Sequence, residues 1–71
     1  MKLNDAKAFG KAVKMYRKKE KATQLQLAAV ANTGVRFISD LENGKPSVQL
    51  DKALRVAKIL GLKLEVPGDE K

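Results

Sequence analysis

Basic side chains are the groups in this sequence best suited to chemistry with a partner. The 71 residues include fifteen lysines and arginines against eight aspartates and glutamates, which gives a net charge of +7. The chain has no histidine and no cysteine, which excludes histidine general bases, thiol nucleophiles, disulfides and Cys/His zinc sites. The carboxylates that an enzyme would need are scattered over the predicted elements: Asp5, Glu20, Asp40, Glu42, Asp51 and Glu65. Without a nucleophile–base pair or a phosphate-cradling glycine loop, we expect a protein that is not an enzyme and needs no cofactor or metal.

The positive charge is concentrated near the start of the chain. Residues 1–22 carry a net charge of +6, residues 23–62 one of +2, and residues 63–71 one of −1. A basic segment beside a near-neutral remainder suits a polyanion. The same lysines, among them Lys2, Lys7 and Lys11, would equally suit a solvated helix face.

Four helices are predicted by apolar residues that recur at spacings of three and four. The first begins after a cap at Asn4 or Asp5 and ends near residues 19–21. Its apolar stripe is Ala6, Phe9, Val13 and Tyr16. We expect Ser47 to cap the fourth helix and Gly61 to end it. The apolar stripe of this fourth helix is Leu50, Ala53, Leu54, Ala57 and Leu60.

Two short helices joined by a three-residue turn lie between these. Thr23 and Gln26 have the spacing of a capping box at the start of the run 24–31. Asn32 suits the left-handed residue at the end of that run. The next run, 35–43, ends at Gly44. Leu27, Ala28 and Ile38 are expected to face one another across the turn. Two such helices make a helix-turn-helix unit.

The sequence changes period at its end. Residues 62–66 alternate apolar and polar side chains, which is typical of a half-buried strand. A lone strand leaves backbone groups unpaired, so we expect it to pair antiparallel with a second copy of the chain. The dimerisation residues are then Leu62, Leu64 and Val66.

The predicted architecture is all-α, a bundle of four helices with a short C-terminal strand that pairs across a homodimer. Residues 1–71 form a single domain, with a core at 5–61, the dimerisation strand at 62–66 and a frayed tail at 67–71. No apolar run approaches the ~20 residues of a membrane helix, and the start lacks a signal-peptide core. We therefore expect a cytoplasmic, nucleoid-associated protein that makes no membrane contact.

The helix-turn-helix residues resemble a known family. The strings Thr23-Gln24-x-x-Leu27-Ala28 and Ile38-Ser39-x-Leu41-Glu42-Asn43-Gly44-Lys45 are similar to the motif of the Xre/Cro-type repressors of lambdoid phages and bacteria. The first helix fits through Phe9-Gly10-x-x-Val13-Lys14-x-x-Arg17. The resemblance covers residues 9–62 and implies a lambda-repressor-like DNA-binding domain. The chain departs from the family at Gly34, where a serine cap is common, and in ending with a strand where a fifth helix is usual.

The resemblance also implies roles for individual residues. It implies phosphate contacts by Gln24, Asn43 and Lys45, and major-groove contacts by Val35, Arg36, Ser39 and Asp40. The fork of Arg36 matches guanine O6 and N7, which makes it the most discriminating of these residues. Phe37 either contacts a thymine methyl or a sugar, or packs against the turn or a partner subunit. Arg17 and Glu42 resemble a family ion pair that braces the fold.

A more specific resemblance concerns the segments 35–39 and 45–50 and the strand ending, which look like those of HipB-like antitoxins. It implies a homodimeric repressor that autoregulates a toxin–antitoxin operon on an inverted-repeat operator and binds a HipA-like kinase toxin. The alternatives are a free-standing repressor, a restriction-modification controller without a toxin, or a pure protein-interaction module whose basic surface meets an acidic partner. Salt-dependent operator binding separates the DNA-binding hypotheses from the last, and a kinase-like reading frame beside the gene identifies the antitoxin.

Overall fold

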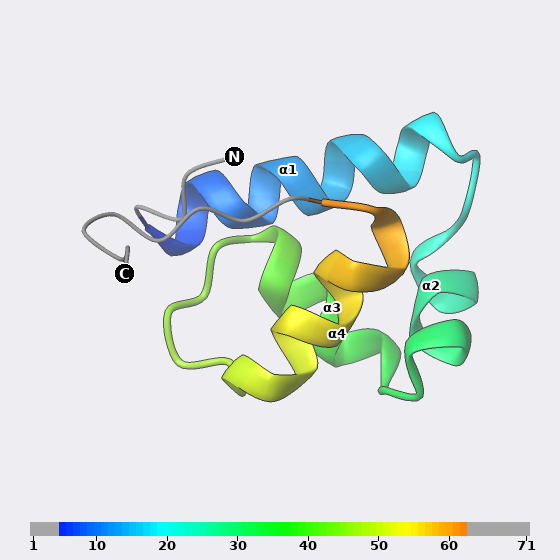
Figure 1. The fold of residues 1–71 in the computed structure, drawn as a ribbon. Coiled ribbons are helices and arrows are strands. Elements are labelled where there is room, and N and C mark those ends of the chain that lie inside the picture. The colour runs from blue at the N-terminus through cyan, green and yellow to red at the C-terminus, as the bar shows by residue number, and fades with distance from the viewer. Residues whose placement is uncertain (1–4, 63–71) are drawn as a thin grey trace, which may run out of the picture.

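The computed structural model describes residues 5–62, which form four helices (Figure 1). These are α1 (Ala6–Lys19), α2 (Gln24–Ala31), α3 (Val35–Glu42) and α4 (Leu50–Leu60). Residues 1–4 and 63–71 lie outside this range, and with them most of the predicted strand and all of the tail. Over residues 5–62 the fold is all-helical, as predicted, and none of its helices is long and apolar enough to cross a membrane.

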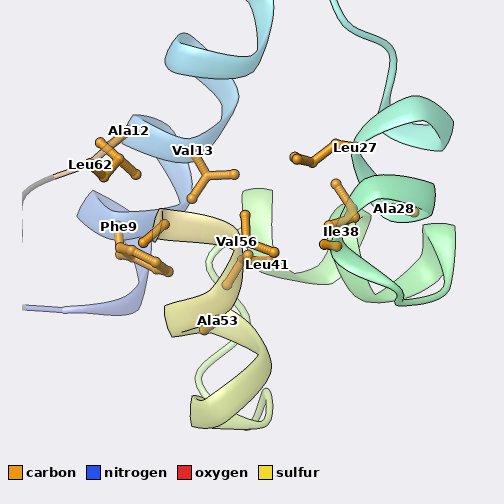
Figure 2. Close-up of a cluster of buried hydrophobic side chains, with 12 residues drawn as sticks. Phe9, Ala12, Val13, Leu27, Ala28, Ile38, Leu41, Ala53, Val56 and Leu62 are labelled. Carbon is orange, nitrogen blue, oxygen red and sulfur yellow. The ribbon is translucent and has the colours of Figure 1, made fainter. Parts of the chain in front are cut away.

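The four helices enclose one core. α1 and α2 both pack against α3, and α4 packs against α1 and α2 (Figure 1). Val13, Ile38 and Val56 are fully buried and come from three different helices (Figure 2). The buried apolar residues are Phe9, Ala12, Val13, Leu27, Ala28, Ala31, Ile38, Leu41, Ala53, Val56, Ala57 and Leu62.

Local hydrogen bonds define the helix ends as predicted. Asp5 caps α1 by accepting from the Ala8 amide at 2.7 Å. The capping box of α2 is confirmed: the Thr23 hydroxyl accepts from the Gln26 amide at 3.0 Å, and the Gln26 side chain accepts from the Thr23 amide at 2.8 Å. Asn32 ends α2 in the left-handed conformation at φ 58°.

The start and the inner face of α4 differ from the prediction. Ser47 does not cap this helix, which begins at Leu50 with Gln49 in the N-cap position. Leu50 and Leu54 are 64% and 42% exposed, whereas Val56, absent from the predicted stripe, is fully buried. The stripe was ambiguous because apolar residues cover more than half of the circumference of α4, so that two overlapping stripes satisfy the same spacing rule.

Leu62 is one of the three predicted dimerisation residues. It is only 8% exposed and packs into the core of its own protomer, where Figure 2 places it beside Ala12 of α1. Its amide donates to the Ala57 carbonyl at 2.9 Å and closes the end of α4. Leu62 therefore anchors the end of α4 to the core.

Gly10 lies where α1 crosses α3 at close range. A Cβ atom at this position would overlap the Leu41 carbonyl oxygen and would lie 2.8 Å from the Glu42 carbonyl oxygen. Backbone atoms cannot move aside as a flexible side chain can, so the missing side chain lets the two helices meet. This contact sets the distance between α1 and the end of α3.

Candidate nucleic-acid interface

One side of α3 is held by the core and the other is left open. Ile38 and Leu41 are buried on the inner side, while Val35 is 44% exposed and Arg36 is exposed in the first turn. Ser39 and Asp40 are half-buried at the margin of the open side. A helix with its side chains is about 10–12 Å in diameter, which fits the ~12 Å width of the DNA major groove. With eight residues, α3 is about 12 Å long. The open side therefore presents side chains as a groove-reading helix requires.

A buried ion pair fixes the end of α3 to the end of α1. The Arg17 Nε donates to Glu42 Oε2 at 2.6 Å, and Arg17 Nη2 donates to Glu42 Oε1 at 3.0 Å. The two side chains are only 10% and 2% exposed. Arg17 Nη1 also donates to the Ala22 carbonyl at 2.8 Å, so the same guanidinium holds the connection that leads into α2.

Hydrogen bonding and charge keep this pair ionised. Burial alone would raise the pKa of Glu42, but hydrogen bonds from Arg17 and Gln24, together with the positive charges of Arg17 and Lys14, lower that pKa below its ordinary value. The hydrogen bond with Glu42 raises the pKa of Arg17, against the opposing effect of burial. In the part of the chain that the structure describes, every buried polar side-chain atom has a hydrogen-bond partner.

Gln24 is drawn into the same cluster. Its side-chain nitrogen donates to Glu42 Oε1 at 3.0 Å, which orients the amide at the first position of α2. A primary amide has two N–H groups, and this contact uses one of them. Glu42 thus positions the side chain for which the family resemblance implies a phosphate contact.

The other two predicted phosphate contacts lie beyond the end of α3. Asn43 and Lys45 are exposed there. Lys45 Nζ lies 3.6 Å from Asp40 Oδ2, with side chains 56% and 35% exposed. An exposed pair of this kind contributes ~0–1 kcal/mol, so a DNA phosphate could readily replace Asp40 as the partner of Lys45.

Phe37 lies away from the open side of α3. Its half-buried ring packs against the core cluster, and Lys52 Nζ of α4 lies 5.9 Å from the ring centroid. Of the two roles that the sequence left open for Phe37, this position supports packing.

Two contributors to this region were not identified from the sequence. Arg55 of α4 donates to the Ala31 carbonyl at 3.1 Å and so secures the end of α2, a contact that no local spacing indicates. Lys14 lies close enough to Glu42 to lower its pKa. The sequence did contain a signal for Lys14, because its three-residue spacing from Lys11 places both lysines on one face of a helix. Across residues 5–62, no group of three metal-ligating side chains comes together.

Comparison with known proteins agrees with this geometry. Residues 13–66 match a family model described as helix-turn-helix. The chain is also 42% identical, over 65 residues, to an uncharacterized HTH-type transcriptional regulator, y4mF, of Sinorhizobium fredii. That alignment covers 89% of this chain and 86% of the relative. The two helices α2 and α3 lie on either side of a tight turn, as this family requires. The chain therefore belongs to the Xre/Cro-type helix-turn-helix family of transcriptional regulators.

Proposed function

We propose that this regulator is a sequence-specific repressor that inserts α3 into the DNA major groove. The observation that carries the proposal is the division of α3 into two sides. Buried Ile38, Leu41 and Glu42 hold its inner side rigidly, and exposed Val35 and Arg36 occupy its first turn. A recognition helix reads base edges with residues near its N-terminus. Arg36 would then contact guanine, Val35 would pack on a thymine methyl, and Asp40 would accept from cytosine N4, with Ser39 facing the same groove.

Phosphate contacts beside the groove would fix the register. Gln24 stands at the start of α2, and Asn43 and Lys45 stand beyond the end of α3. The Glu42 cluster connects these two places, because its carboxylate binds Gln24 directly and Asn43 is the next residue along the chain. Contacts of this type position a protein on DNA without reading its sequence.

Arg36→Ala should reduce affinity for the operator by about 1–3 kcal/mol and relax the preference at one or two base pairs. Lys45→Ala should instead weaken binding to all duplexes and reduce the slope of log K against log salt by about one. Fluorescence anisotropy with the operator and with unrelated duplexes at two salt concentrations measures both effects. An equal loss from Arg36→Ala on every duplex would contradict a base-reading role, and binding of no duplex at all would favour the protein-interaction module.

The proposal includes a homodimer on an inverted-repeat operator. Its support is the alternating pattern of residues 62–66, which begins at Leu62. The proposed dimerisation residues are Leu62, Leu64 and Val66, of which the last two lie outside the described range. Strand pairing about a two-fold axis would set two recognition helices about one DNA turn apart.

Removing residues 63–71 should yield a folded monomer with reduced operator affinity, because Leu62 stays in place and the core remains filled. Analytical ultracentrifugation gives the oligomeric state, and circular dichroism verifies that the helices persist. If the shortened chain sediments as a dimer and binds its operator normally, the strand has another role.

We propose further that the repressor is an antitoxin that autoregulates its operon and binds a HipA-like kinase toxin, acting in the cytoplasm at the nucleoid and without enzymatic activity of its own. The support is the resemblance of segments 35–39 and 45–50 to HipB-like antitoxins. The alternative is a free-standing repressor or a restriction-modification controller. Co-purification of this chain with the product of a neighbouring kinase-like gene tests the antitoxin role, and a neighbourhood without such a gene favours the alternative.

A further inference from the structure

Three lysines of α1 line a shallow pocket at the end of the recognition helix. Lys7, Lys11 and Lys14 form its α1 wall, and Glu42 and Asn43 form its α3 wall. All three lysines are exposed, and their spacings of four and three residues place them on one face of α1. The pocket therefore combines three cations with the side-chain amide of Asn43, which can donate hydrogen bonds.

Close backbone contacts fix the position of this wall. Gly44 follows α3 in the left-handed conformation at φ 80°, and a Cβ atom there would lie 2.9 Å from the Lys7 Cα. Gly10 brings the next turn of α1 against the end of α3 as well, since a Cβ atom there would lie 2.8 Å from the Glu42 carbonyl oxygen. The lysines are thus carried on a backbone that is held in place relative to α3, although their side chains are in solvent.

Glu42, the acidic residue that lines the pocket, does not cancel the positive charge of the lysines. Glu42 is only 7% exposed, and it accepts hydrogen bonds from Arg17 and Gln24. The charge of Arg17 compensates that of Glu42, which leaves the three lysines as a net charge of +3. Within residues 5–62 the ion pairs are Arg17–Glu42 and Lys45–Asp40, so none of these three lysines is paired there.

Such a stripe is unfavourable for the free protein. Like charges at spacings of three and four residues on a helix repel by ~0.2–0.5 kcal/mol per pair. An anion placed between them would remove this repulsion. The lysine stripe thus destabilises the free protein and lies next to the end of α3. The negative charge of a duplex backbone would complement it.

We infer that this pocket binds a backbone phosphate of the duplex that α3 reads, at the edge of the major groove beside the C-terminal end of α3. Lys7, Lys11 and Lys14 supply the charge, and the Asn43 amide donates a hydrogen bond to a phosphate oxygen. This inference rests on the proposed DNA-binding function. It extends the contact surface from the helix-turn-helix unit to the first three turns of α1.

The test compares two charge reversals in the full-length chain. Lys11→Glu changes the central lysine of the pocket. Lys58→Glu is the matched control, because Lys58 is an exposed helical lysine in the last turn of α4 and does not line the pocket. Both variants change the net charge equally. Binding to one duplex is measured across salt concentrations, and the unfolding midpoint of each variant verifies that it is folded.

We expect Lys11→Glu to reduce the slope of log K against log salt by about one and to weaken binding about tenfold at 0.1 M salt. Lys58→Glu should keep the wild-type slope. Equal losses of affinity in both variants would show that only the overall charge of the protein matters, and would contradict a phosphate site in the pocket. Wild-type affinity and salt slope in Lys11→Glu would contradict it as well. Lys11→Gln repeats the comparison if the reversal impairs folding. A wild-type chain that binds no duplex would refute the proposed function itself, a result distinct from failure of the pocket alone.

Discussion

Glu42→Ala should lower the free energy of unfolding of this domain by about 3–5 kcal/mol, because it leaves the buried Arg17 guanidinium without its counter-ion. A domain of this length has a total stability of only about 4–10 kcal/mol, so the loss is a large part of the whole. Asp40→Ala is the control, since it breaks the exposed pair with Lys45 and should cost less than about 1 kcal/mol. Urea denaturation of both variants measures the difference.

A double-mutant cycle with Arg17→Met separates the ion pair from other effects of either substitution. Because the two side chains form two direct hydrogen bonds, the cycle should give a coupling energy above about 1 kcal/mol. An absence of coupling would mean that the pair does not brace the fold.

The same pair gives an expected pH dependence. In the folded chain the pKa of Glu42 lies below its ordinary value of 4.5, so the unfolded chain takes up the proton first as the pH falls. The stabilisation by ionised Glu42 is therefore fully present above pH 4.5 and is lost as the pH falls through the folded-state pKa. The stability difference between wild type and Glu42→Gln should shrink over that range. A difference that is constant with pH would contradict the assigned charge state.

Gly10→Ala should destabilise the domain by about 2–3 kcal/mol, although alanine is the better helix former by about 1 kcal/mol. The added methyl group would overlap the Leu41 carbonyl oxygen and press on that of Glu42, so α1 and α3 would have to separate. Helix propensity and tertiary packing thus predict opposite signs for one substitution. Thermal unfolding decides between them.

Gly34→Ser is the matched control for that substitution. Gly34 is the N-cap of α3 and has no side chain to cap the helix, and a Cβ atom added there would meet nothing within 4 Å. A serine there should stabilise the chain by a few tenths of a kcal/mol, because its hydroxyl can accept from an amide of the first turn. If Gly10→Ala reduced the thermal stability no more than Gly34→Ser, that result would contradict the close contact between α1 and α3.

The features that the sequence predicted correctly are mostly local ones. The caps at Asp5 and Thr23 and the left-handed Asn32 depend on residues within four positions of each other. The buried face of α4 was predicted less well, because the choice between Leu54 and Val56 depends on what the helix packs against. Arg55 could not be assigned, since its partner Ala31 is 24 residues away.

The candidate interface likewise combines features that the sequence predicts with contacts that only the structure shows. The exposure of Arg36 follows from the helical pattern, and the exposure of Val35 agrees with the groove-facing position that the family resemblance implies. The hydrogen bond between Gln24 and Glu42 joins two helices and is visible only in three dimensions. The pairing of residues 62–66 across a dimer stays a prediction.

Selection of binding sites from a pool of random duplexes tests the central claim, that α3 reads base pairs as part of a two-fold assembly. The full-length chain should enrich an inverted repeat whose half-site centres are about 10–10.5 base pairs apart, or a multiple of that spacing. Arg36→Ala, selected in parallel, should lose the preference for a G·C pair at one position in each half-site. A pool that binds the chain yet shows no enriched sequence would contradict base reading by α3, as would an enriched site that Arg36→Ala selects unchanged.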